Sequence, residues 1–396
     1  MIQQRTITAA EMRGINRSAV LEIIRRESPI ARTTIAKGLE ISLPTVMRIV
    51  DTLIEDGFVR PQGESEWTGG RRRPLLEFNA DGNVVLGVDM GGTNLYGAIS
   101  DIGGHIIAEV DLERRGAAGE ECYALLEKLI DDLLARSELA GRRVRGIGVG
   151  APGITHHRAG IVKWAYPLKW RDFPLKARLH ERYKLPITVD NDVNLAALGE
   201  FWFGAGQNVK NMILITVGAG VGAGIIIDGT LYRGSSEASG EIGHMIPGRE
   251  FLGHTYVDFG ALESMASVTG IVKQAQEALA AQPEAAARAT SGEQIVEAAA
   301  RGEAWARTLM DQVVDYLTLA VANLSVSFDP ELIVLRSGQS RLADVLVKPI
   351  ARRMQGTMPA PAPLVVSNLG LRATVMGAIV TVLHNTSNFY IVHKLS

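Results

Sequence analysis

Two glycine-rich turns carry the clearest chemical potential in the 396-residue chain. The first contains Gly91, Gly92 and Thr93, within the stretch 85–95, and the second contains Gly218 and Gly220, within the stretch 214–224. Each stretch reads as a strand, a glycine turn and another strand. If the turns face each other across a cleft, their backbone N–H groups can converge on a phosphate. Neither fits G-x-x-x-x-G-K-[ST] or G-x-G-x-x-G, so a P-loop and a dinucleotide-binding fold are not supported, and a single glycine turn is more often structural than functional.

A second set of polar side chains near the N-terminus suits DNA. Ser42, Thr45 and Arg48 would face outward at the start of a helix, where hydroxyl and guanidinium groups can reach base edges or phosphates. Arg71, Arg72 and Arg73 follow a glycine pair and suit a phosphate track or a narrow minor groove. Taken alone, a three-helix pattern is more often a packing module, and a run of arginines is usually only solvent-exposed. The order and spacing of the helices and the arginines together favour DNA binding.

The elements that would position these side chains are three helices and a hairpin within residues 15–80. The first helix should end near Ser28-Pro29, because proline disfavours helix at the residue before it. The second should start at a capping Thr33 or Thr34. In the third, Ser42 is a good N-cap and Val46, Ile49, Val50, Leu53 and Ile54 follow the spacing of one buried face. Gly57 ends it, and strands near 58–59 and 75–78 would form a wing with a basic tip.

The rest of the chain alternates strands and helices, which predicts an α/β body with helices flanking sheets. The apolar runs that predict strands are 84–88, 144–149, 187–189, 212–217 and 332–335, and the clearest helical stretches are 120–136 and 303–326.

Composition excludes several classes of protein. Apolar residues make up 46% and charged residues 21%, as in an ordinary globular chain of two or three domains. The net charge of −2 predicts no partner by itself, although residues 1–80 hold 12 basic against 10 acidic side chains. One cysteine, Cys122, cannot form an internal disulfide, so a cytoplasmic location is expected. The longest apolar stretch, 212–227, is interrupted by glycines and shorter than a membrane span, so no membrane partner is expected.

Longer motifs resemble those of the ROK family (repressors, open reading frames and kinases). Residues 15–80, with GGRRRP, resemble the winged helix of its regulators. The body resembles its sugar kinases at DMGGTN (89–94), GVGAPG (148–153), WRDFPL (170–175), VDNDVNLAALGE (189–200), GAGVGAGIIIDGTLYRG (218–234) and GEIGHM (240–245). The resemblance implies a winged helix-turn-helix over residues 1–80, followed by a two-lobed, actin-like (ribonuclease-H-like) α/β body. Lobe 1 would span 81–196, with a C-terminal helix from 372–396 returning to it, and lobe 2 would span 197–371.

The resemblance also implies a hexose-type pocket between the lobes, lined by Asn191, Asp192, Glu241, His244 and Glu263. Carboxylates, amides and imidazole suit sugar hydroxyls, which both donate and accept hydrogen bonds. In a kinase, Asp192 would take the proton from the attacking hydroxyl, although an aspartate in such a pair is more often a helix cap.

A structural zinc is not expected, so no metal is assigned. The three positions where the family commonly has zinc-binding cysteines hold His254, Tyr256 and Ala261, and structural zinc wants four ligands. His244 would then serve the ligand or local packing. His156 and His157 have no obvious partner and are expected to be exposed.

Three departures from the kinase pattern indicate a weakened ATP site: Ala219 replaces a threonine, Arg336 is bulky where adenine would lie, and Thr374 replaces a glycine. The leading hypothesis is therefore a repressor that binds a double-stranded DNA operator and responds to a small sugar effector, with no cofactor. The enzyme alternative is a sugar kinase with a DNA-binding arm, using Mg-ATP and Asp192. The third is a constitutive DNA-binding protein whose body serves only oligomerisation.

Effector identity, the direction of the response and the operator sequence stay open. The segment 165–170 has Pro167 where the family supplies an asparagine, and Lys169 adds a cation, which leaves open an unusual sugar, an anionic sugar or an altered loop. A homodimer or a dimer of dimers is expected, because helix-turn-helix proteins usually bind paired half-sites.

Overall fold

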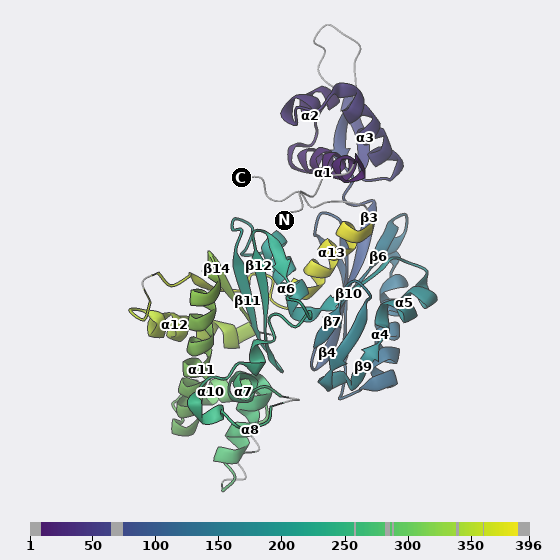
Figure 1. The fold of residues 1–396 in the computed structure, drawn as a ribbon. Coiled ribbons are helices and arrows are strands. Elements are labelled where there is room, and N and C mark those ends of the chain that lie inside the picture. The colour runs from purple at the N-terminus through teal and green to yellow at the C-terminus, as the bar shows by residue number, and fades with distance from the viewer. Residues whose placement is uncertain are drawn as a thin grey trace.

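A computed structural model describes residues 9–64, 74–256, 259–281, 286, 289–337, 340–358 and 360–386. The chain forms an N-terminal winged helix above a two-lobed α/β body (Figure 1). This is the fold class that the sequence predicts. Within the described residues, no helix is both long and apolar enough to cross a bilayer.

The winged helix contains three helices, α1 (Ala9–Glu27), α2 (Arg32–Gly38) and α3 (Leu43–Glu55). Val46, Val50 and Leu53 form the buried face of α3, as their spacing predicts. Strands β1 (Val59–Glu64) and β2 (Pro74–Phe78) pair antiparallel as the wing. The prediction for the start of α2 is wrong: its N-cap is Ala31, which makes no side-chain capping bond, so the helix relies on packing instead.

Lobe 1 is built on a five-stranded sheet in the order β10-β6-β3-β4-β5. Its strands are β3 (Asn83–Met90), β4 (Asn94–Asp101), β5 (Ile106–Glu113), β6 (Arg143–Ala151) and β10 (Ile187–Asn191). A small sheet of β7 (Ile154–His156), β8 (Ile161–Ala165) and β9 (Trp170–Phe173) adjoins it, with helices α4 (Gly119–Leu134), η1 (Ser137–Leu139), η2 (Tyr166–Leu168) and α5 (Leu175–Tyr183).

Lobe 2 repeats this design with the order β13-β12-β11-β14-β15. Its strands are β11 (Met212–Val217), β12 (Val221–Ile227), β13 (Thr230–Tyr232), β14 (Leu332–Ser337) and β15 (Leu364–Val366). In both sheets an antiparallel three-strand meander is extended by two parallel strands. The helices of this lobe are η3 (Ile242–His244), η4 (Arg249–Phe251), α7 (Ala261–Ala266), α8 (Val268–Ala278), α10 (Gly292–Arg301), α11 (Ala304–Phe328) and α12 (Ser340–Met354).

Two helices join the lobes. The chain leaves lobe 1 through α6 (Asp192–Phe203), which follows β10 and leads to β11, and it returns through α13 (Arg372–Thr386), which follows β15. The two helices cross at glycines: a Cβ atom on Gly199 would lie 2.1 Å from the carbonyl oxygen of Ala373, and one on Gly377 would lie 1.7 Å from that of Leu195. Only glycine permits so close an approach of two helix backbones.

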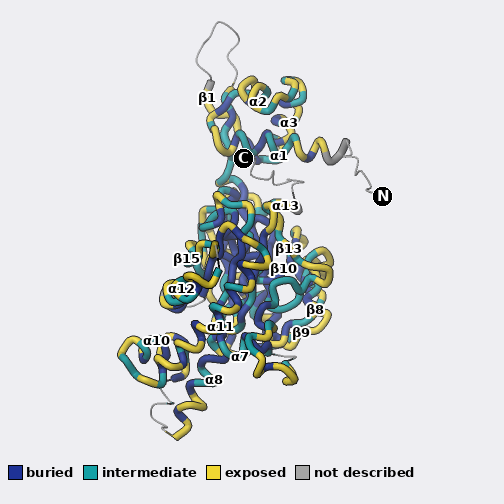
Figure 2. Tube along the Cα trace, turned by 60° about the vertical axis from the view of Figure 1, so that its left-hand side comes forward, coloured by how far each residue is buried: buried dark blue, intermediate teal, exposed yellow. Residues whose placement is uncertain are grey.

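The winged helix shares a hydrophobic core with lobe 1. Phe58 and Leu76 of the winged helix belong to the same buried cluster as Val85 of β3 and Val375 and Ile379 of α13. Figure 2 shows buried residues running through the centre of the body and continuing into the winged helix. The two units are therefore packed together instead of being connected by a free linker.

Candidate ligand cleft and nucleic-acid interface

The two glycine turns meet where the lobes face each other. Gly91 and Gly92 follow β3, and a Cβ atom on Gly92 would lie 2.7 Å from the Cβ atom of Ala219 in the turn between β11 and β12. The side chain of Arg114 is bonded to the first turn. Its guanidinium donates to the carbonyl oxygen of Gly92 and, at 2.8 Å, to that of Pro167. Thr93 is the last residue of this turn before β4. The structure thus brings together the two turns that the sequence singles out.

Asn191, and not Asp192, caps the helix that begins at this cleft. The side-chain oxygen of Asn191 accepts the backbone N–H of Asn194 at 2.9 Å, and its amide nitrogen donates to the carbonyl oxygen of Gly153 at 3.0 Å. Asp192 is the first residue of α6, and its Oδ1 accepts the N–H of Val193 at 2.9 Å. Within the described ranges, no hydrogen bond to its Oδ2 is recorded, which leaves this oxygen for a ligand.

Arg336 crosses from lobe 2 to the end of β3. It is buried near the end of β14, where its Nη2 donates to Oδ2 of Asp89 at 3.3 Å and its Nε donates to the carbonyl oxygen of Gly370 at 2.9 Å. Thr374 is also buried and donates to the carbonyl oxygen of Asp192 at 3.3 Å. Arg336 and Thr374, two of the three residues that differ from the kinase pattern, therefore bond to Asp89 and to the backbone of Asp192.

Burial opposes the negative charge of the acidic side chains near the two glycine turns. Burial, reinforced by the neighbouring Asp89, raises the pKa of Asp192 to about 7. Burial also raises the pKa of Glu241 and Glu263, and His244 partly opposes both shifts. Glu263 has a structural task besides, because its Oε2 accepts the N–H of Val221 at 2.9 Å and so holds the second glycine turn. Glu241 precedes η3 and exposed His244 ends it.

Asp192→Asn should therefore stabilise the chain relative to the wild type, and the stabilisation should be larger at pH 8 than at pH 5. The folded chain holds the proton of Asp192 more tightly than the unfolded chain, in which an aspartate titrates near pH ~3.9. Ionisation thus favours unfolding as the pH rises from about 4 to about 7, and asparagine escapes this cost. The difference in melting temperature should grow by several degrees between pH 5 and pH 8. Asp228→Asn, at an exposed site, is the control; an equal difference at both pH values would contradict the prediction.

A segment of lobe 2 that leads to Glu241 is bonded to lobe 1 at two points. Arg233 forms a bidentate ion pair with buried Asp190, at 2.7 and 2.6 Å. Oε2 of Glu237 accepts the N–H of His157 at 2.9 Å and lies 2.8 Å from its Nδ1. The expectation that His156 and His157 lack a partner is wrong, because the second lobe supplies one: Oε1 of Glu237 also lies 3.8 Å from Nδ1 of His156. His156 is exposed as expected, and His157 is partly buried. Glu237 is at least 80 residues from both histidines in the chain, so no local pattern in the sequence could reveal these contacts.

The loop where the family commonly binds zinc has no thiolates, and its residues do not fit that metal. The rings of His254 and Tyr256 lie 6.2 Å apart, centroid to centroid, and Ala261 begins α7. Across the described parts of the chain, no three or more His, Cys, Asp or Glu side chains are grouped as metal ligands.

The polar end of α3 lies on the outside of the winged helix. Ser42 occupies the N-cap position, but its hydroxyl lies 2.8 Å from that of Thr45 and caps no backbone N–H. Ser42 and Arg48 are exposed, and Thr45 is partly exposed. The predicted basic tip of the wing, Arg71 to Arg73, lies outside the described residues.

Comparisons with known proteins agree with both halves of this architecture. The model of the ROK family matches residues 85–385, and a winged helix-turn-helix DNA-binding model matches residues 15–60. A xylose repressor of Caldicellulosiruptor bescii is 31% identical over 390 residues, covering 96% of this chain and 98% of the relative. A glucokinase of Halalkalibacterium halodurans is 37% identical over 287 residues, covering 68% of this chain and 84% of the relative. A crystal structure described as a ROK family transcriptional regulator, homolog of E. coli MLC protein, superimposes with a TM-score of 0.81 at 24% identity, covering 96% and 98% of the two chains.

Proposed function

This chain belongs to the ROK family, and from that premise we propose that it is a transcriptional repressor whose DNA binding responds to a sugar or sugar derivative. The observation that carries the proposal is the extent of the matches. The similarity to a xylose repressor runs through the winged helix and the body, whereas the similarity to a glucokinase covers 68% of the chain.

The proposed partner is a double-stranded operator. The N-terminal end of α3, with Ser42, Thr45 and Arg48, would enter the major groove, and Arg71, Arg72 and Arg73 would follow the phosphates. A homodimer or a dimer of dimers would present two such surfaces to paired half-sites. The proposed division of labour places DNA binding in residues 1–80 and ligand binding between lobe 1 (81–196, with the returning 372–396) and lobe 2 (197–371).

The proposed effector lies between the lobes. The carboxylates of Asp192 and Glu241 and the imidazole of His244 are suited to contact sugar hydroxyls directly, because each has hydrogen-bonding capacity left. Asn191 and Glu263 would position the pocket, since the Asn191 amide is occupied on both sides and Glu263 already accepts Val221. The name of the relative makes D-xylose the first sugar to test.

We infer further that the chain uses no nucleotide. The Arg336 guanidinium sits against Asp89 beside the glycine turns, and the hydrogen bond of Thr374 joins α13 to Asp192. The ion pair occupies the carboxylate of Asp89, so a magnesium ion could bind this carboxylate only by displacing a buried guanidinium.

The proposal is tested with the full chain and double-stranded DNA. The chain should retard, in a gel, a duplex selected from a random library. One of D-xylose, D-glucose and glucose 6-phosphate should change the dissociation constant of the chain for this duplex by about tenfold or more. Failure to retard any selected duplex at low salt, with and without these sugars, would overturn the proposal.

A sugar kinase is the second candidate, favoured by one observation. Asp192 has Oδ2 available and a pKa of about 7, which suits a general base near neutral pH. An assay of ADP release over the same two unphosphorylated sugars decides between the candidates. ATP-dependent turnover that disappears in Asp192→Asn would favour the kinase; we expect no turnover in the wild type.

A further inference from the structure

Arg145, on β6 of lobe 1, contacts the end of the helix proposed to read DNA. Its Nη2 donates to the carbonyl oxygen of Asp56, the C-cap of α3, and its guanidinium lies 4.2 Å from the centroid of the Phe58 ring. A cation bonded to the last carbonyls of a helix is favoured by the helix dipole. The orientation of α3 therefore depends on a side chain that belongs to the body.

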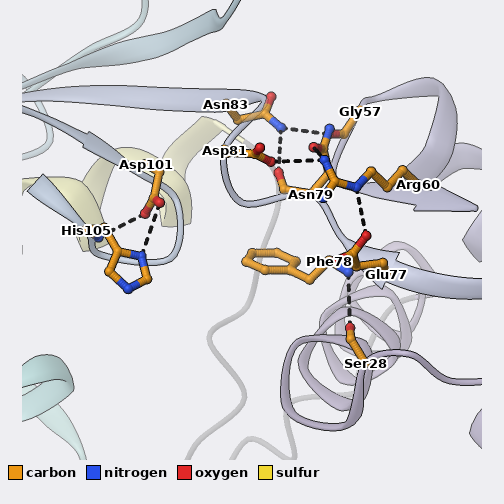
Figure 3. Close-up of polar contacts among 10 residues, drawn as sticks. All are labelled: Ser28, Gly57, Arg60, Glu77, Phe78, Asn79, Asp81, Asn83, Asp101 and His105. Carbon is orange, nitrogen blue, oxygen red and sulfur yellow. Dashed lines mark hydrogen bonds and ion pairs between the residues drawn. The ribbon is translucent and has the colours of Figure 1, made fainter. Parts of the chain in front are cut away.

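Asn83, the first residue of β3, completes the contact. Its side-chain oxygen accepts Nε of Arg145 at 2.6 Å, and its amide nitrogen donates to the carbonyl oxygen of Gly57 at 2.6 Å. The side chain of Asn79 donates to the same carbonyl at 2.8 Å. Figure 3 shows Asn83 and Asn79 converging on Gly57 where the winged helix meets lobe 1. We call Arg145, Asn83, Asp56 and Gly57 the junction.

The two strands of the junction also reach the ligand cleft. β3 begins at Asn83 and carries Asp89 near its other end, and all of its residues are buried. β6 carries Arg145 near its start and pairs in parallel with β3 as far as Asp89 and Gly150. At a rise of about 3.3 Å per residue, the six steps from Asn83 to Asp89 span roughly 20 Å. The register of this pairing shifts between Val84 and Leu86, opposite Arg145, and from Leu86 to Asp89 the pairing with β6 is regular.

Lobe 2 touches the cleft end of this strand pair. The ion pair between Arg336 and Asp89 joins β14 directly to β3, and both groups are buried. A change in the separation of the lobes on ligand binding would therefore act on this ion pair and, where the pair holds, on the end of β3. A movement of β3 at Asp89 would also move Asn83, which is bonded to Arg145 and Gly57 in the junction.

We propose that Arg145 is a positioning residue that couples occupancy of the interlobe cleft to the orientation of the α3 helix. The inference rests on the proposed function. The contacts of Arg145 fit such a role better than they fit simple stabilisation. Its bonds run to a carbonyl and an amide oxygen, while the carboxylate of Asp56 is 2.6 Å from Arg17. Burial, with help from Arg143 and Arg17, lowers the pKa of Arg145 to about 10, so the cost of burying its charge opposes the favourable contact with the end of α3.

The test measures coupling in both directions with the full chain. Sugar affinity is measured with and without the selected operator, and operator affinity is measured with and without the responding sugar from the panel of D-xylose, D-glucose and glucose 6-phosphate. The two ratios must be equal, because coupling between sites is reciprocal. In Arg145→Gln the ratio should fall to within about twofold of one, while sugar affinity without DNA stays within about twofold of the wild type.

Two further variants keep the outcome decisive. Arg143→Gln removes an exposed guanidinium from the same strand and should keep the wild-type ratio. Arg145→Lys keeps the charge but cannot reach both acceptors in the same way, so an intermediate ratio is expected, and it replaces the glutamine variant should that one not fold. A wild-type ratio in both Arg145 variants, or equal losses of sugar and DNA affinity, would overturn the inference. A wild-type chain with no coupling to any of the three sugars would instead overturn the proposed function.

Discussion

Gly377→Ala is expected to lower the free energy of unfolding by about 3 kcal/mol, at the upper end of the usual cost of overpacking. The added methyl group would lie 1.7 Å from the carbonyl oxygen of Leu195, which belongs to the backbone of α6 and cannot rotate away. The helices would have to separate, and these are the two connections between the lobes. Chemical denaturation measured by circular dichroism gives the size of the effect.

Gly218→Ala is the matched control, because the same added group would meet nothing within 4 Å at that position. It should change the free energy of unfolding by less than about 0.5 kcal/mol. If both variants unfold at the wild-type denaturant concentration, the close crossing of α6 and α13 is not a feature of the folded protein in solution.

Glu241→Gln is expected to weaken binding of the responding sugar by roughly 10- to 100-fold. A hydrogen bond to a charged group contributes about 1.5–3 kcal/mol, and about 1.4 kcal/mol corresponds to tenfold in affinity. The carboxylate is largely buried with His244 nearby, so little water remains to replace the lost contact. Calorimetric titration measures the change, and operator affinity without sugar should stay at the wild-type value.

Glu250→Gln removes an exposed carboxylate from the same lobe and should bind sugar as the wild type does. A Glu241→Gln variant with unchanged sugar affinity would remove Glu241 from the pocket. Operator affinity that no sugar changes, in the wild type or in Glu241→Gln, would favour the hypothesis of a constitutive DNA-binding protein whose body serves only oligomerisation.

Local patterns in the sequence were enough to predict several of the elements. The spacing of Val46, Val50 and Leu53 predicts α3, and the apolar run at 84–88 predicts the centre of β3. The two strand-turn-strand stretches predict a duplicated body, and both sheets have the same strand order. Such patterns succeed because burial of one face, or of a whole strand, imposes a short period on the side chains.

The bonds between elements could not be predicted in the same way. Arg336 looked like an obstacle to adenine, but the position of its guanidinium depends on Asp89, which is 247 residues away in the chain. The role of Arg145 could not be predicted, because nothing near it in sequence shows that the end of α3 lies beside it. Asn191 and Asp192 are adjacent, and only the path of the backbone decides which of them caps α6. These contacts depend on the three-dimensional path of the backbone, which the spacing of residues in the sequence does not encode.

The core that the winged helix shares with β3 and α13 limits how this regulator can be re-engineered. Exchanging the first 80 residues for those of another regulator, to redirect the chain to a new promoter, would set foreign side chains against Val85, Val375 and Ile379. A folded chimaera would need complementary residues on both sides of this contact, in the new winged helix and in β3 and α13. Specificity for DNA is better altered by grafting only the outward side chains of α3 and the wing.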